Sequence, residues 1–270
     1  MRIPFTKMQG TGNDFVLIDE FDRVLIPKSK KSEFTSKISD RHFGIGSDGV
    51  IFVQRSDRFD AKFYFYNPDG SLAEMCGNGV RCIARYLHDR RKVKKNKLEI
   101  ETLTGLITAE INENQVRVDM GIPEIEFVDK VIDICGDSYR VTSVRMGNPH
   151  AVLFFDDIER IDIRKIGKKI MQLKEFPEGV NVHLVQKLRE GEFRIRSYER
   201  GVYGETLACG TGICASGVAA FLKKLSGKEM EFHASGGDLK IELDTESEKI
   251  TRVYLTGPAE FVFDGEIELS

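Results

Sequence analysis

The chain has 270 residues, 41% of them hydrophobic, five cysteines and a formal net charge of −3. This length allows one or two globular domains, and the negative charge argues against a nucleic-acid partner, whose phosphates require a basic surface. The first ten residues, MRIPFTKMQG, lack the apolar run of a signal peptide, and no later segment approaches the roughly 18 apolar residues of a membrane span. These features predict a cytoplasmic protein, with no membrane partner, whose cysteines are thiols.

Few helices and many strands are predicted along the chain. In chain order, Ser32 can cap a short helix through Asp40, a second helix lies near 78–90, residues 161–173 are amphipathic, and 211–225 is helical. The last segment is small and apolar on nearly all sides, which is typical of a buried helix. The basic run DRRKVKKNK, 89–97, is interpreted as a solvated helix end. Half-buried strands are predicted where polar and apolar residues alternate, at 97–103, 115–120, 192–198 and 239–244.

One cysteine motif occurs twice, half a chain apart. CGNG at 76–79 recurs as CGTG at 209–212, and other landmarks recur in the same order at offsets of 132 to 135 residues. FYFYNPDG matches IRSYERG, DGVIFV matches VNVHLV, and GNDFVLID matches GNPHAVLF. The offset slips by one between Tyr198 and Cys209, so the second half carries one extra residue within ERGVYGETLAC.

The repeat predicts an α/β (α+β) fold of two pseudo-symmetric lobes. Each lobe is expected to be a mostly antiparallel curved sheet around a central helix that begins at its cysteine. The boundary is placed in MGIPEI, where a glycine and a proline interrupt a strand pattern. The predicted lobes are 1–121 and 122–270, with the last strand able to pack back on the first lobe, and the active cleft is predicted between them.

A cysteine at a helix start is a candidate acid or base. The helix N-terminus presents unpaired N–H groups and the positive end of the dipole, both of which favour a thiolate. The following glycines leave backbone N–H groups uncovered, so a carboxylate or a developing enolate can bind there. Two such thiols can remove a proton from one face of a carbon and return one to the other face. The alternative, that Cys76 and Cys209 are small buried hydrophobes, is weakened by the recurrence.

No cofactor and no metal are predicted. Cys82 and Cys214 turn away from the helix-start thiols at about 100° per residue, and their spacing does not match a zinc motif, so both are predicted as core residues. Cys135 has no helix-start context. GIGSDG, 44–49, lacks the lysine of a phosphate-binding P-loop. A thiol redox enzyme would need neighbouring thiols such as C-x-x-C, which the chain lacks.

Together these segments resemble the diaminopimelate epimerases, cofactor-independent two-cysteine enzymes of lysine synthesis. The resemblance runs essentially end to end through GTGNDFVLID, GIGSDG, NPDGSLAEMCGNGVRC, MGNPHAV, GVNVHLV and YERG followed by GETLACGTG. It implies that family's fold, diaminopimelate as a small-molecule substrate, and a homodimer. It also implies that Cys76 takes the proton from the L,L substrate and that Cys209 does so in the reverse direction.

The resemblance further implies a set of substrate-binding residues: Asn13, Asn67, Gly77, Asn78, Asn148, Asn181, Glu199, Arg200, Gly210 and Thr211. Arg200 can hold one carboxylate bidentately, the asparagines supply neutral donors and acceptors, and Glu199 can hold an ammonium. Backbone N–H groups at the two helix starts would hold the other carboxylate. His150 is the family's histidine near the site. The plainer readings stay open: asparagine and glycine are common in turns, Glu199 and Arg200 can form a surface pair, and His150 can be a core residue.

Two positions depart from the family pattern. Gly49 stands where some members have glutamine, and Tyr203 is the simplest extra residue, because the family phrase is ERGVGETLAC. Tyr203 either bulges outward or alters how Arg200 and Cys209 are placed. The nearest alternative function is a proline-type or hydroxyproline-type two-cysteine racemase, which needs no site for a second amino-acid end. An amino-acid-binding module without catalysis is the alternative from a different class.

Overall fold

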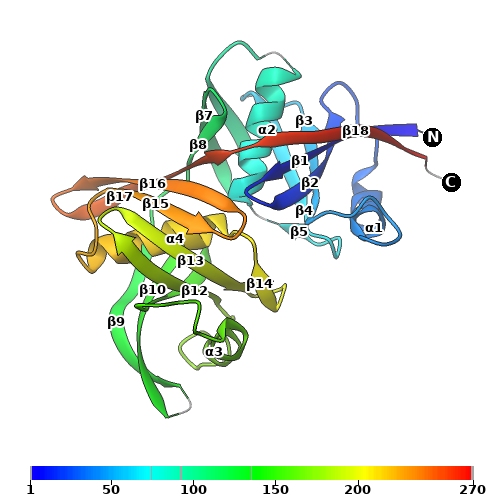
Figure 1. Ribbon diagram of the computed structural model, residues 1–270. Helices are drawn as coiled ribbons and strands as arrows, with labels where there is room; N and C mark the ends of the chain where they lie inside the picture. Colours follow the sequence, from blue (N-terminus) through cyan, green and yellow to red (C-terminus); the bar gives the residue numbers. More distant parts are fainter. Residues whose placement is uncertain (1, 74, 92, 135, 269–270) are drawn as a thin grey trace. The chain divides into compact units, whose positions relative to one another are not determined.

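The computed structural model describes residues 2–73, 75–91, 93–134 and 136–268. The chain divides into two compact units (Figure 1). Unit 1 comprises Met1–Val118 and Gly257–Ser270, and unit 2 comprises Asp119–Thr256. The division lies close to the boundary predicted after residue 121, and the end of the chain belongs to unit 1.

Unit 1 is a mostly antiparallel sheet with two helices. Its helices are α1 (Lys28–Ser39) and α2 (Gly77–Asp89), and its strands are β1 (Arg2–Gly10), β2 (Asn13–Glu20), β3 (Val50–Gln54), β4 (Ala61–Tyr66), β5 (Leu72–Ala73), β6 (Lys97–Thr102), β7 (Gly105–Asn112), β8 (Gln115–Asp119) and β18 (Glu260–Glu268). The strands pair in the order β18, β1, β2, β3, β4, β6, β7 and β8, with β5 also on β4. Among the pairs of described residues, β2–β3 and β4–β6 are the parallel ones.

Unit 2 repeats this plan. Its helices are α3 (Ile163–Ile170) and α4 (Gly210–Leu222), and its strands are β9 (Glu124–Ile134), β10 (Asp137–Met146), β11 (Asn148–Phe154), β12 (Asn181–Arg189), β13 (Glu192–Glu199), β14 (Gly204–Thr206), β15 (Glu229–Ala234), β16 (Gly237–Glu246) and β17 (Lys249–Pro258). The order is β9, β10, β11, β12, β13, β15, β16 and β17, with β14 on β13 and parallel pairs at β11–β12 and β13–β15. Each pairing step in unit 1 has its counterpart here, which confirms the predicted duplication.

A helix lies at the centre of each unit (Figure 1). α2 contacts strands from β1 to β7, and α4 contacts strands from β10 to β16, so each sheet curves around its helix. Cys76 and Cys209 are the N-caps of these helices, and both have extended backbone angles. The prediction that each central helix begins at its cysteine is therefore confirmed. Within the described ranges, no helix has the length and apolar character needed to cross a membrane.

The start of α1 differs from the sequence prediction. The helix begins at Lys28, with Pro27 as its N-cap, so Ser32 lies inside the helix and does not cap it. The carbonyl of Pro27 accepts the N–H of Lys30 at 2.8 Å, and Lys31 in the first turn forms a buried ion pair with Glu20. A lysine-rich turn is expected to be exposed. The burial of Lys31 depends on the carboxylate of Glu20, which lies in a different element, β2.

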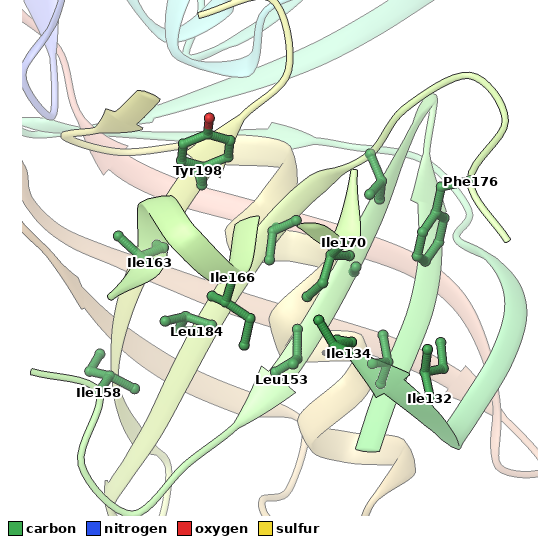
Figure 2. Close-up of a cluster of buried hydrophobic side chains, with 14 residues drawn as sticks. Ile132, Ile134, Leu153, Ile158, Ile163, Ile166, Ile170, Phe176, Leu184 and Tyr198 are labelled. Atoms are coloured by element: carbon green, nitrogen blue, oxygen red, sulfur yellow. The ribbon is translucent and has the colours of Figure 1, made fainter. Parts of the chain in front are cut away.

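The core of unit 2 explains the apolar run NVHLV in β12 (Figure 2). Val182 and Leu184 pack with Ile163, Ile166 and Ile170 of α3 on one face of the sheet. Successive side chains of a strand point to opposite faces, so His183 and Val185 point to the face that α4 covers. Both are fully buried, which means that the first part of β12, residues 181–185, is enclosed on both sides.

Candidate active site

Cys76 lies where α2 begins and is half-buried. Its sulfur accepts the N–H of Gly79 at 3.4 Å and lies 3.8 Å from Oδ1 of Asn13. The N–H groups of Gly77 and Asn78, in the first turn, have no acceptor within the helix. The helix start and its N–H groups stabilise a negative charge, whether on the sulfur or on a bound carboxylate.

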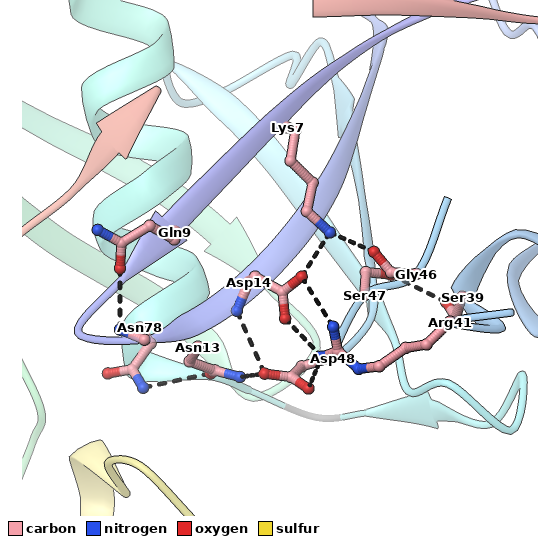
Figure 3. A network of polar contacts seen from close by, with 11 residues as sticks. Lys7, Gln9, Asn13, Asp14, Ser39, Arg41, Gly46, Ser47, Asp48 and Asn78 are labelled. Carbon is pink, nitrogen blue, oxygen red and sulfur yellow. Dashed lines mark hydrogen bonds and ion pairs between the residues drawn. The ribbon is translucent and has the colours of Figure 1, made fainter. Parts of the chain in front are cut away.

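Asn13 is held by both ends of its amide (Figure 3). Its Nδ2 donates to Asp48 at 2.7 Å, and its Oδ1 accepts from Nδ2 of Asn78 at 3.2 Å. Arg41 holds the other oxygen of Asp48 at 2.7 Å. The fully buried Arg81 donates to Oδ1 of Asn78 at 2.9 Å. These contacts turn the carbonyl oxygen of Asn13 toward Cys76.

GIGSDG supplies this support and carries no phosphate signature. Ser47 is tied to Ser39 at the end of α1, and Asp48 follows it directly. Gly49 has a φ of +152°, and a Cβ there would lie 2.3 Å from the ring of Phe65. The glycine is therefore required by a close approach, and the side-chain contact possible with glutamine at this position is absent.

Cys209 lies at the start of α4 in a more enclosed setting. Burial raises the pKa of the Cys209 thiol well above its ordinary value, and the charge of Glu199 and a hydrogen bond to it raise this pKa further. The N–H of Gly212 and the hydroxyl of Thr211, 3.7 Å from the sulfur, act in the opposite direction. Glu199 also accepts a hydrogen bond from Thr206 at 2.6 Å. This cysteine is therefore held as a thiol.

Arg200 and two asparagines form a group of hydrogen-bond donors in unit 2. The N–H of Arg200 donates to Oδ1 of Asn181 at 3.0 Å, and its guanidinium donates to the carbonyl of Glu178 at 2.8 Å. Nδ2 of Asn181 is buried and has no hydrogen-bond partner among the described residues. Asn148 begins β11, and β12, which Asn181 begins, pairs with it. An unpaired buried donor such as Nδ2 of Asn181 suits a bound anion.

His150 is fully buried and belongs to a chain of hydrogen bonds. Its Nε2 lies 2.9 Å from Oδ1 of Asn148, its Nδ1 lies 2.9 Å from Nε2 of His183, and Nδ1 of His183 lies 2.9 Å from Oγ of Ser197. Burial lowers the pKa of His183 to about 3. Burial, followed by the charges of His183 and Arg200, lowers the pKa of His150 well below its ordinary value. Both rings are therefore neutral.

Cys209, His150 and His183 are also the residues whose ligand atoms lie within 4.8 Å of one another in the described part of the chain. All four ring nitrogens of the two histidines already have hydrogen-bond partners. A metal bound here would have to displace the bond between the two rings.

Gly212 allows α4 to approach this chain. A Cβ at Gly212 would lie 2.0 Å from Cε1 of His183. We expect Gly212→Ala to lower the free energy of unfolding by about 1–3 kcal/mol, because the buried ring must move. Urea unfolding measures this change, with Gly227→Ala as the control, since a Cβ at Gly227 meets nothing within 4 Å. Equal effects in the two variants would contradict the close packing of α4 on His183.

The remaining predicted residues lie in the two hairpins that follow β4 and β13. Asn67 begins the turn between β4 and β5, where its Nδ2 donates to Ser71 at 2.9 Å. The equivalent turn between β13 and β14 is one residue longer, since Tyr66 pairs with Leu72 whereas Tyr198 pairs with Glu205. The offset slip therefore lies in this turn. Tyr203 there is 73% exposed, so the extra residue bulges outward.

Tyr203 also has a positive φ of 51°. We expect Tyr203→Gly to raise the free energy of unfolding by about 1 kcal/mol, because glycine adopts this conformation without steric cost. Epimerase turnover should stay within roughly twofold of the parent, since the side chain faces solvent. Val202→Gly, at an exposed neighbour without positive φ, should bring no such gain. A large loss of turnover in Tyr203→Gly would place this side chain in the site.

Sequence reasoning did not single out four supporting residues: Asp48, Arg81, His183 and Ser197. Asp48 and His183 lie within GIGSDG and GVNVHLV, so the motifs contained a signal for them. Arg81 and Ser197 likewise lie within NPDGSLAEMCGNGVRC and IRSYERG, but the motifs do not show which partners these two side chains bind. Cys82 and Cys214 are buried core residues, as predicted, and burial raises the pKa of Cys82 to about 12. Cys135 lies outside the described residues.

Known structures share this fold. A PhzF-family phenazine biosynthesis protein from Bacillus anthracis matches with a TM-score of 0.77 and 18% identity, covering 100% of both chains. A hydroxyproline epimerase from Agrobacterium vitis, with bound trans-4-hydroxy-L-proline, matches with a TM-score of 0.72 and 16% identity, covering 98% of this chain and 92% of that one. The fold is thus the one that PhzF-family proteins and proline-type epimerases share.

Sequence comparison gives the particular family. The family model "Diaminopimelate epimerase" matches residues 5–126 and 142–262. The diaminopimelate epimerase of Methanothermobacter thermautotrophicus is 41% identical over 97% of this chain and 98% of its own length. The chain belongs to the diaminopimelate epimerase family, and it is an isomerase.

Proposed function

We propose that this chain interconverts L,L- and meso-diaminopimelate, with Cys76 and Cys209 as the acid–base pair. The observation that carries the proposal is the repeated helix start: each thiol is the N-cap of a central helix and is followed by glycine. A thiol in this position lies beside N–H groups that stabilise the charge that develops when an α-proton leaves. Epimerisation then requires both thiols to reach opposite faces of one α-carbon.

The charges near the two thiols support different resting roles. Glu199 favours the protonated form of Cys209, whereas Asn67, the equivalent residue in unit 1, is neutral. The buried guanidinium of Arg81, held on Asn78, adds positive charge to the first turns of α2. Cys209 is therefore assigned as the proton donor, and Cys76 as the base, when the L,L isomer binds.

In the forward reaction, the Cys76 thiolate forms an S–H bond with the α-proton. The electron pair of the broken C–H bond is delocalised into the α-carboxylate, where helix N–H groups stabilise it. The Cys209 thiol then donates its proton to the opposite face of the carbon and becomes a thiolate. The enzyme is left with its two protonation states exchanged, which suits it for the reverse reaction until a proton is returned through solvent.

The donor group in unit 2 favours a substrate with a second amino-acid end. Arg200, Nδ2 of Asn181 and Nδ2 of Asn148 offer only donors, which suits a second carboxylate. Proline-type substrates, the alternative, have no second carboxylate for these donors to bind.

The test is incubation of the purified protein with L,L-diaminopimelate in deuterated water without added cofactor, followed by NMR of the α-proton. Loss of that signal with appearance of the meso isomer is the expected result. A folded protein with reduced thiols that exchanges proline, but not diaminopimelate, would overturn the substrate assignment.

We also propose a cytoplasmic location and a homodimer. The four described cysteines are thiols rather than disulfides, which suits a reducing compartment. Sedimentation velocity measures the oligomeric state, and a monomer at micromolar concentration would contradict the second proposal.

A further inference from the structure

We propose that Ser197 and His183 are positioning residues that fix which end of the Asn148 amide faces the substrate. They act through the hydrogen-bonded chain Ser197–His183–His150–Asn148, whose three bonds are each 2.9 Å long. Ser197, His183 and His150 are at most 3% exposed, whereas Asn148 at the end of the chain is only partly buried. A buried chain thus ends at an amide that a substrate can reach.

The direction of the chain follows from the proton of Ser197. A neutral imidazole has one donor and one acceptor nitrogen, so the direction of one bond determines the direction of the next. The Ser197 hydroxyl has no other hydrogen-bond acceptor among the described residues, so its proton goes to Nδ1 of His183. Nε2 of His183 then donates to Nδ1 of His150, and Nε2 of His150 donates to Oδ1 of Asn148.

In the opposite direction, Ser197 would accept from His183, and its own buried proton would have no acceptor. An unsatisfied buried donor is costly, so this arrangement is disfavoured. The serine hydroxyl therefore determines the amide orientation two imidazole rings away.

Unit 1 shows that the fold does not require these polar residues. At the equivalent positions, unit 1 has Phe15, Ile51 and Phe65, all buried, with the two aromatic rings in edge-on contact at 5.6 Å. The strand registers match, since Ile51 pairs with Phe65 as His183 pairs with Ser197. A buried polar chain that could be replaced by an apolar set implies a role beyond packing.

The two asparagines that begin β2 and β11 are consequently oriented in opposite ways. Asp48 occupies Nδ2 of Asn13, which leaves the carbonyl oxygen toward Cys76. His150 occupies Oδ1 of Asn148, which leaves Nδ2 as a donor. Asn148 then joins Nδ2 of Asn181 and Arg200 in a set that accepts a carboxylate and repels an ammonium. This step rests on the proposed function, because it assigns the second carboxylate of diaminopimelate to these donors.

Nitrogen-15 NMR of the imidazole rings tests the chain without substrate. The expected result is that His150 and His183 are both neutral with the proton on Nε2, and that Ser197→Ala removes this preference in His183. A proton on Nδ1 of either ring in the parent protein would overturn the proposal. The protein has five histidines, so substitution of the other three assigns the signals of His150 and His183.

Kinetics test the consequence for substrate. We expect Ser197→Ala to raise KM for L,L-diaminopimelate roughly tenfold with kcat within about threefold. Without the serine, the Asn148 amide is flipped in part of the molecules, and these lose the Nδ2 donor to the substrate carboxylate. Ser197→Thr, which keeps the hydroxyl, should restore KM. Ser216→Ala is the matched control, because this buried serine donates to the carbonyl of Gly212 and is outside the chain. An unchanged KM in Ser197→Ala would overturn the positioning role while the proposed function stands. If the parent protein did not act on diaminopimelate, the proposed function would fail. The tautomer measurement would still show whether the hydrogen bonds from Ser197 to Asn148 run in the proposed direction.

Discussion

Cys76→Ala and Cys209→Ala are each expected to lower the turnover number for epimerisation roughly 10³- to 10⁴-fold, because each removes one of two proton-transferring groups. The two variants should differ in deuterated water. Cys209→Ala keeps the Cys76 thiolate, so it should exchange the α-proton of the L,L isomer without forming the meso isomer. Cys76→Ala should behave in the same way toward the meso isomer. NMR of the α-proton together with chiral separation of the products measures both results.

Cys82→Ala and Cys214→Ala are the matched controls, since they make the same change in the same two helices at buried positions. Their turnover should stay within about twofold of the parent, with a loss of stability of about 1 kcal/mol. Circular dichroism of all four variants should be unchanged. Near-normal epimerisation by either helix-start variant would refute the two-base mechanism.

The repeat made the helix starts predictable from the sequence. The orientation of the side chains could not be predicted in this way. Two copies of one motif, with small residues after each cysteine, indicated where α2 and α4 begin, and the one-residue slip located the longer turn. Asn13 and Asn148 occupy the same place in this repeat, and a sequence gives no difference between their amides. The difference comes from Asp48 in one unit and His150 in the other, and each is brought into place by pairing of neighbouring strands.

Burial was the second property that the sequence did not determine. His183 looks like an ordinary strand residue in NVHLV, yet this part of β12 is covered on both faces and the His183 ring contacts α4. Lys31 looks like a solvent-facing residue of α1, yet it pairs with Glu20 in the interior. In both cases the partner that satisfies the buried group lies in a distant segment, so local periodicity gives no sign of it.

Glu199→Gln is expected to lower kcat/KM roughly a hundredfold and to shift the pH profile of the reaction. Burial raises the pKa of Cys209 first, and the charge of Glu199 adds to it, so removal of that charge lowers this pKa. From L,L to meso, Cys209 must carry a proton, and the alkaline limb of the profile should move to lower pH. From meso to L,L, Cys209 must be a thiolate, and the acidic limb should move in the same direction. Rates in both directions across the pH range measure the two shifts.

Glu205→Gln is the control for loss of a carboxylate from the same hairpin. Glu205 lies on β14 and pairs with Arg196 at 2.7 Å, and it is not among the groups that raise the pKa of Cys209. This variant should lose some stability and keep the parent pH profile. If Glu199→Gln reduced the rate without moving either limb, Glu199 would act on the substrate alone, and its role in holding Cys209 as the proton donor would be wrong. If both limbs move together, the Glu199 carboxylate sets the pH range in which Cys209 carries its proton.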